Sequence, residues 1–245
     1  MKNSRIGEAF PMGATVIGKR AVQFVSKINR KKETSLVLYE KNTGEKEEYK
    51  LSNKYQIGNM YSIIIEDIDP SKYNYNYSEN GKEILDPYAK VICGNETWGN
   101  GECKLLSAGI KIENFKWEDD RNLMYSYESS IIYQLHVRGF TKHLSSKVKK
   151  KGTFEGLCEK IPYLKELGIT AVEMMHAYEF LEMERKFMEG SKLPMSYQEE
   201  EPVLNYWGYK QGFYFAPKSS YAAGSNPVYS FKALVKEMHK NGIEV

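Results

Sequence analysis

The sequence has few cysteines, no long apolar run and little net charge. Its three cysteines, Cys93, Cys103 and Cys158, form no CxxC pair and leave one residue over, so structural disulfides and a thiolate metal site are not expected. No stretch approaches the roughly 18 apolar residues of a membrane-spanning helix. The N-terminus also lacks the apolar core of a secretory signal. We therefore expect a cytoplasmic protein with free thiols and no membrane partner.

The charge balance is nearly even, with 35 Lys and Arg against 32 Asp and Glu, a formal net charge of +3 over 245 residues. A surplus this small predicts no nucleic-acid partner. Lys142, Lys147 and residues 149–151 make a basic run in the loop expected after the first strand of the second half, and we interpret it as a solvated surface. Hydrophobic residues at 41% and charged residues at 27% are typical of a folded globular chain.

The sequence also lacks the common catalytic signatures. The four histidines show no HExxH-type spacing, and there is no Gly-rich phosphate loop, GxSxG elbow or dinucleotide fingerprint. We therefore expect neither a metal nor another cofactor. The acidic clusters are Asp119-Asp120 and residues 199–201, and adjacent charges of this kind are usually solvated loop residues. No catalytic residue is assigned from them.

Residues 1–115 are predicted to form an immunoglobulin-like β-sandwich. Turn-forming Gly, Asn and Pro residues separate short apolar or alternating runs at 15–17, 21–25, 36–39, 60–65 and 73–77. Tyr73, Tyr75 and Tyr77 alternate, which places their rings on one face of a strand. We interpret this stripe as cross-strand packing, with a glycan-binding platform as the alternative.

After a linker at 116–130 the period of the sequence changes. The pattern predicts a strand at 131–137, a helix at 154–167, a strand at 170–175, a long loop, a helix at 231–240 and a new strand starting at Ile243. Strands that alternate with helices indicate βαβ units and a parallel sheet. Thr153 and Ser230 are the expected N-caps of the two helices, and Pro162 is expected to kink the first helix.

The segment 133–141 (YQLHVRGFT) is similar to the first barrel strand of pullulanases and isoamylase-type debranching enzymes, members of the α-amylase superfamily. The resemblance continues in the same order through 152–154 (GTF), 160–168 (KIPYLKELG), 171–173 (AVE), 205–209 (NYWGY) and 215–217 (FAP). Residues 10–15 (FPMGAT) and 86–90 (DPYAK) resemble, more loosely, the glycogen-binding-type module that precedes this barrel. His176 departs from the pattern, since many relatives have Pro there.

This resemblance implies a glycoside hydrolase that cleaves α-1,6 bonds in glycogen, pullulan or limit dextrin. It also implies that residues 131–245 begin a (β/α)8 TIM barrel. Such a barrel takes about 250 residues, whereas only 115 follow position 130, so we expect an incomplete, truncated barrel. In the family the nucleophilic Asp, the acid/base Glu and a second Asp lie on later strands. Retaining hydrolysis needs two carboxyl groups about 5–5.5 Å apart, so the chain alone is expected to be inactive.

The long connection at 178–229 is expected at the C-terminal face of the barrel, where substrates bind. In the family the last Tyr of NYWGY is a stacking platform beside the cleaved bond. The resemblance gives this role to Tyr209, with Trp207 and Tyr206 as neighbouring sugar-binding residues and Gly208 as the small residue of a tight turn. The alternative is that these rings only pack the loop onto the rim. Trp98 and Trp117 are expected to pack at the domain junction.

Three other interpretations remain open from the sequence. A glucan-branching or transferase relative would share the module and the barrel, although a different first-strand motif would be expected. A non-catalytic glucan-binding protein would use only the sandwich and the Tyr209 surface. A remnant with unpaired strand edges would fold poorly and aggregate.

Overall fold

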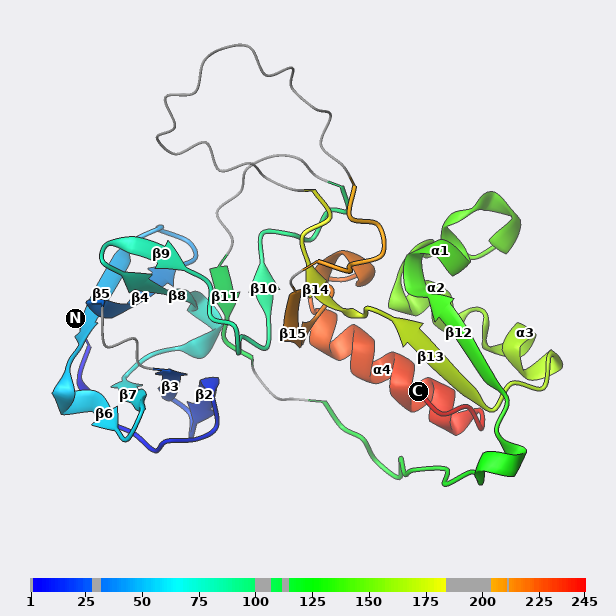
Figure 1. Ribbon diagram of the computed structural model, residues 1–245, viewed down its shortest axis with the longest axis horizontal. Coiled ribbons are helices and arrows are strands. Elements are labelled where there is room, and N and C mark those ends of the chain that lie inside the picture. Colours follow the sequence, from blue (N-terminus) through cyan, green and yellow to red (C-terminus); the bar gives the residue numbers. More distant parts are fainter. Residues whose placement is uncertain (1, 28–31, 100–106, 112–114, 184–203, 211) are drawn as a thin grey trace, which may run out of the picture.

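The structure is a computed structural model that describes residues 2–27, 32–99, 107–111, 115–183, 204–210 and 212–245. Cys103 and the acidic cluster at 199–201 lie outside the described residues. Figure 1 shows a β-rich N-terminal half beside a C-terminal half that carries the helices, with strands β10, β11, β14 and β15 between them. No helix of the described part is long and apolar enough to cross a membrane.

The N-terminal half contains two antiparallel sheets. In the described residues the first sheet has the order β1-β7-β3-β2, with β6 paired to β7, and the second has the order β10-β11-β8-β4-β5, with β9 paired to β8. The strands of the first sheet are β1 (Ser4–Ile6), β2 (Gly13–Ile17), β3 (Ala21–Lys27), β6 (Gln56–Ile57) and β7 (Met60–Glu66). Those of the second are β4 (Thr34–Glu40), β5 (Lys46–Leu51), β8 (Tyr73–Glu79), β9 (Lys82–Ile84), β10 (Ile92–Cys93) and β11 (Ser107–Gly109). The predicted β-rich N-terminal region is confirmed.

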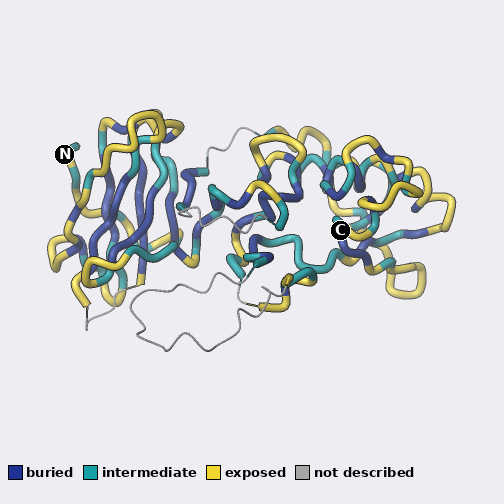
Figure 2. The backbone as a smooth tube through the Cα atoms, turned by 90° about the horizontal axis from the view of Figure 1, so that it is seen from above, coloured by how far each residue is buried: buried dark blue, intermediate teal, exposed yellow. Residues whose placement is uncertain are grey.

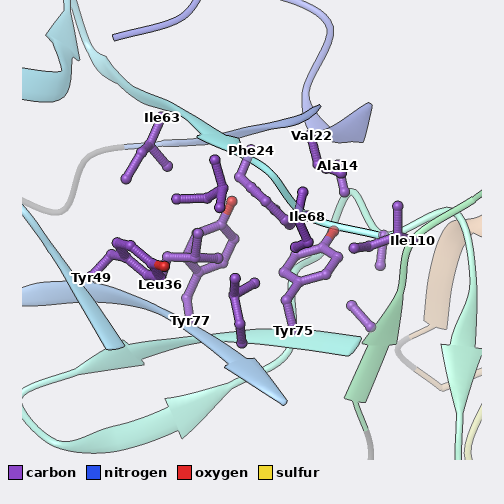
Figure 3. Packing of buried hydrophobic residues seen from close by; sticks show 14 of the residues in the cluster. Ala14, Val22, Phe24, Leu36, Tyr49, Ile63, Ile68, Tyr75, Tyr77 and Ile110 are labelled. Atoms are coloured by element: carbon purple, nitrogen blue, oxygen red, sulfur yellow. The ribbon is translucent and has the colours of Figure 1, made fainter. Parts of the chain in front are cut away.

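The core of this half lies between the two sheets. Tyr75 and Tyr77 extend from β8 toward Phe24 and Ile63 of the facing sheet (Figure 3). The ring of Tyr75 meets that of Phe24 edge-on, with centroids 5.0 Å apart, and its hydroxyl donates to Asp86 Oδ2 at 2.7 Å. Both tyrosines are buried, and Tyr73 is half-buried and packs against the same core. The packing interpretation is therefore confirmed for Tyr75 and Tyr77, which cannot form a glycan platform.

In the C-terminal half, β12 (Ile132–His136) pairs in parallel with β13 (Ala171–Met175), with Ile132 opposite Ala171 and His136 opposite Met175. Residues 243–244 lie along the edge of β13 that is opposite to β12. A parallel bridge joins Ala171 and Glu244, and the Glu244 carbonyl accepts the Val172 N–H at 2.8 Å. The described residues thus place the two predicted strands and the start at Ile243 side by side. All three segments run in one direction.

The helices differ from the prediction in three places. The expected helix at 154–167 is two helices, α2 (Phe154–Cys158) and α3 (Ile161–Glu166), and Pro162 lies in the first turn of α3. A first-turn proline removes no intrahelical hydrogen bond, so it starts the second helix instead of kinking one. A further short helix, α1 (Val137–Lys142), follows β12, so Lys142 is not a loop residue.

The last helix, α4 (Pro227–Lys240), begins before the predicted Ser230. Its N-cap is Asn226, whose side chain accepts the Tyr229 N–H, and Pro227 occupies the first turn. Ser230 instead donates to Glu155 Oε1 at 2.6 Å, which joins α4 to α2. The predicted N-cap of α2 is confirmed, because Thr153 Oγ1 accepts the Gly156 N–H.

A hairpin links the two halves. It is formed by β14 (Tyr178–Phe180) and β15 (Gly212–Pro217), which pair only with each other in the described residues. Phe213 packs against the sandwich core, and Phe215 stacks on Tyr88 with ring centroids 5.4 Å apart. Figure 2 shows the buried strands of the sandwich at one end of the molecule and the helical half at the other. The hairpin therefore positions the loop at 204–210 relative to both halves.

Candidate functional site

Aromatic side chains gather where the two parallel strands end. β12 ends at His136 and β13 at Met175, and the loop at 204–210 lies against these ends. In open and closed parallel sheets, ligands bind at the carboxyl ends of the strands. The rings here come from different parts of the chain: Trp98, His136, His176, Tyr178, Tyr206, Trp207, Tyr209 and Tyr221.

Trp207 and Tyr209 form an exposed pair that we call the aromatic platform. Their ring centroids are 6.4 Å apart and the ring planes are inclined by 17°, so the two faces are almost parallel. Trp207 is 45% exposed and Tyr209 is 68% exposed. A sugar presents a flat patch of C–H groups that packs on such faces, while phenol and indole groups offer hydrogen bonds at the rim.

Gly208 makes the turn between these two residues. Its φ is +72°, a left-handed conformation that favours glycine. A Cβ at this position would lie 2.7 Å from a ring atom of the buried Phe180, so no other residue fits without movement of that ring. His176 Nδ1 donates to the Trp207 carbonyl oxygen at 2.5 Å and meets the Tyr209 ring edge-on at 5.2 Å. The predicted tight turn is present, and His176 braces it.

Tyr206 lies differently from its two neighbours. It is half-buried, its ring stacks on His136 with centroids 4.6 Å apart, and it meets the Trp98 ring in an edge-to-face contact. His136 Nε2 lies 3.0 Å from the Tyr206 carbonyl oxygen. Of the three predicted sugar-binding residues, the structure therefore brings Trp207 and Tyr209 to the surface and packs Tyr206 beneath them.

His136 is the polar centre beneath this loop. Its Nδ1 accepts the Gly139 N–H at 2.9 Å and caps helix α1, which leaves the proton of the neutral ring on Nε2, facing Tyr206 and the Tyr221 hydroxyl. Burial lowers the pKa of His136 below its usual range, and the nearby charge of Arg138 acts in the same direction. The neutral imidazole is therefore the form that the site holds.

Trp98 attaches the N-terminal half to this site. Its ring stacks on Tyr221 with centroids 5.6 Å apart, and the Arg138 guanidinium lies 4.6 Å from its centre. The prediction that Trp98 packs at the junction is confirmed. Trp117 instead packs on Phe115 and beneath Lys232 of α4, and remains 37% exposed.

A buried ion cluster lies at the base of the hairpin, where Lys218 follows β15 and Glu179 belongs to β14. Lys218 Nζ lies 2.6 Å from Glu179 Oε1 and 2.7 Å from Glu182 Oε1, with all three side chains at most 3% exposed. Asn95 donates from the N-terminal half to Glu179, at 2.8 Å, and to Glu182, at 3.2 Å. Because each carboxylate is enclosed and paired, neither can reach a ligand. The one sequence signal is Glu179 inside the apolar run 178–181.

The remaining candidates have structural partners. Asp120, expected to be solvated, lies 3.1 Å from His239 Nδ1 of α4, with its side chain only 12% exposed; that expectation is wrong for Asp120. Burial raises the pKa of the Cys158 thiol to about 12, so this thiol is not a nucleophile. In the described residues no group of three or more His, Cys, Asp or Glu side chains is placed to hold a metal ion.

Known proteins resemble the chain in sequence and in fold. It is 37% identical over 188 residues to isoamylase 1 of the Arabidopsis thaliana chloroplast, covering 69% of this chain and 22% of that protein. A glycogen operon protein GlgX homologue of Haemophilus influenzae is also 37% identical over 188 residues, covering 67% and 26%. The chain thus spans about a quarter of the length of these curated relatives. No family model matches.

Among solved structures, a pullulanase from Paenibacillus barengoltzii in complex with maltohexaose and α-cyclodextrin superimposes with a TM-score of 0.71 at 24% identity. The match covers 97% of this chain and 37% of the pullulanase. At this identity the likeness shows a shared fold. It extends over both halves of the chain.

Proposed function

We propose that this chain, a homologue of the isoamylase and GlgX proteins, is part of a debranching glycoside hydrolase that cleaves α-1,6 bonds in an α-glucan such as glycogen, pullulan or limit dextrin. The observation that carries the proposal is the pair of exposed, nearly parallel rings of Trp207 and Tyr209 at the carboxyl ends of β12 and β13. The sequence relatives give the reaction class, and the rings give the chain a surface for sugar. The cytoplasmic location expected from the sequence stays a prediction.

The proposed architecture has three parts. Residues 1–115 are an immunoglobulin-like sandwich of the glycogen-binding type, 116–130 a linker and 131–245 the first part of a (β/α)8 barrel. Its support is the order of β12, β13 and the segment at Ile243, which lie parallel and adjacent. In such a barrel each strand pairs with the next along the chain, with a helix between them.

Within this site Tyr209 is the proposed sugar-stacking residue and Trp207 its sugar-binding neighbour. Tyr206 is proposed to support the loop that carries them. Tyr206 holds the loop through its ring contact with His136 and its carbonyl hydrogen bond. No described carboxylate is proposed as the catalytic acid or nucleophile. Glu179 and Glu182 both pair with Lys218, and their side chains are buried.

Glucan binding is tested by affinity electrophoresis of the 245-residue chain in a gel containing glycogen. Wild type is expected to migrate more slowly than in a gel without glycogen, and Tyr209→Ala is expected to lose most of this retardation. Tyr127→Ala is the matched control, since Tyr127 is a fully exposed tyrosine in the short 3-10 helix at 127–129. Equal migration of wild type in both gels would contradict the proposed binding.

The hydrolytic part needs separate tests. We expect no release of reducing sugar from pullulan by these 245 residues alone, because the described carboxylates offer no opposed pair at the platform. Measurable release would show that a catalytic pair was overlooked. The coding sequence downstream of Val245 tests the reaction class: an in-frame Asp, Glu and second Asp on later strands support it, and their absence contradicts it while leaving glucan binding.

A further inference from the structure

A continuous row of rings leads away from the aromatic platform along the hairpin. Beyond Tyr209 the ring of His176 follows at 5.2 Å, that of Tyr178 at 5.1 Å from His176, and that of Tyr214 at 4.8 Å from Tyr178. The last contact joins β14 to β15, with the two ring planes 72° apart. The row therefore connects the proposed stacking residue to a second tyrosine in the neighbouring element.

Tyr178 is held in place at the middle of this row. Its ring covers Gly212, where a Cβ would lie 2.4 Å from a ring carbon, so the close approach requires glycine. Its hydroxyl donates to the Gly208 carbonyl oxygen in the platform turn at 3.5 Å, a long and weak contact. Tyr178 is half-buried. It thus acts as a fixed support between the platform and Tyr214.

Tyr214 lies where the pairing of β15 with β14 is irregular, so its direction is judged from its contacts. Its ring packs on Tyr178, whereas Phe213 packs against the sandwich core and Phe215 stacks on Tyr88 of the N-terminal half. Tyr214 meets Tyr178 in an edge-to-face contact and is 64% exposed, so much of its side chain is open to solvent. Tyr214 is thus nearly as exposed as Tyr209, which is 68% exposed.

We propose that Tyr214 is a second sugar-stacking position, so that the site takes a linear α-glucan segment running from Tyr209 along the row to Tyr214. This inference rests on the proposed function, because it takes Tyr209 as the first position. Two ring systems, His176 and Tyr178, separate the two exposed faces. The ligand class is therefore an oligosaccharide longer than a disaccharide, and short sugars use Tyr209 alone.

The test compares maltose and maltohexaose by isothermal titration of the 245-residue chain and its variants. Tyr209→Ala is expected to weaken both sugars. Tyr214→Ala is expected to weaken maltohexaose roughly three- to ten-fold, the worth of one aromatic stacking contact, and to leave maltose unchanged. Tyr214→Phe keeps the ring and should bind as wild type does, and Tyr127→Ala is the exposed-tyrosine control.

Each outcome separates the two proposals. If wild type binds both sugars and Tyr209→Ala weakens them, but Tyr214→Ala binds maltohexaose as well as Tyr127→Ala does, the second position is wrong and the platform stands. If wild type binds neither sugar, the glucan surface itself is wrong. A lowered unfolding midpoint for Tyr214→Ala with unchanged maltohexaose affinity would make Tyr214 a packing residue and overturn the inference.

Discussion

Two regions of the molecule, strand β8 of the sandwich and the segment formed by the loop at 204–210 and strand β15, use tyrosine in opposite ways. On β8 of the sandwich, Tyr75 and Tyr77 are at most 3% exposed, whereas Tyr209 and Tyr214 beside the parallel strands are more than 60% exposed. β8 lies between β11 and β4 under a facing sheet, while β15 pairs only with β14 in the described residues. Tyrosine in a covered strand stabilises the fold, and tyrosine at an open hairpin is free to bind.

The largest expected effect is in the sandwich. Tyr75→Ala should lower the free energy of unfolding by about 3–5 kcal/mol, because it leaves a cavity between the sheets and removes the hydrogen bond to Asp86. Tyr75→Phe keeps the ring and should cost only about 1–3 kcal/mol, because Asp86 Oδ2 loses this donor while Oδ1 keeps the Tyr88 N–H. Urea denaturation followed by circular dichroism measures both. A loss for Tyr75→Ala no larger than for Tyr127→Ala would contradict the burial described here.

The buried ion cluster gives the next effect. Lys218→Met should cost at least about 3 kcal/mol, because it leaves the carboxylates of Glu179 and Glu182 buried without a cation. The control is Lys50→Met, which removes a lysine from an exposed pair with Glu33 and should cost at most about 1 kcal/mol. Equal losses for the two variants in urea denaturation would show that the cluster is open to water.

His136 should make the stability of the protein depend on pH. Because burial lowers the pKa of His136, the unfolded chain takes up a proton at higher pH than the folded chain does. The stability that the neutral His136 ring contributes is fully present above the pKa of histidine in the unfolded chain, about 6.5. It is lost as the pH falls through the lower pKa of the folded state. Thermal unfolding at pH 7.5 and 5.5 measures this loss.

His136→Asn should make that pH dependence shallower, since Asn caps helices well and does not titrate. His143→Asn removes an exposed histidine and is the control. A pH dependence that is equally steep in wild type and His136→Asn would show that His136 is not its source.

The sequence predicted those elements whose pattern is long enough to repeat. The strands at 13–17, 21–27, 34–40, 60–66 and 73–79 lie within a few residues of the predicted runs, whereas β1, β6, β9, β10 and β11 are two or three residues long and have no period to detect. The six-residue strand β5, at 46–51, was also missed, because four of its residues are charged and only Tyr49 and Leu51 are buried. The break between α2 and α3 was missed because apolar spacing continues across it from Leu157 to Ile161 and Leu164.

The residue types of the candidate site were predictable from the sequence, but the directions in which their side chains point were not. Tyr206, Trp207 and Tyr209 are adjacent in sequence, and only the turn at Gly208 and the contact with His136 decide which ring faces inward. The buried ion cluster joins Asn95 to residues more than 80 positions later, and charged residues are rarely buried. Glu179 inside the apolar run 178–181 marks one member of the cluster, but no local pattern identifies its partners.

The smallest expected change in stability belongs to the residue with the largest proposed role. Tyr209→Ala should alter the free energy of unfolding by less than about 0.5 kcal/mol, because a ring that is 68% exposed loses little burial when it is removed. The same variant should lose most of its retardation by glycogen. The opposite profile is expected of Tyr75→Phe, which should be less stable but fully retarded. If both variants changed stability and binding together, exposure would not separate packing tyrosines from binding ones in this fold.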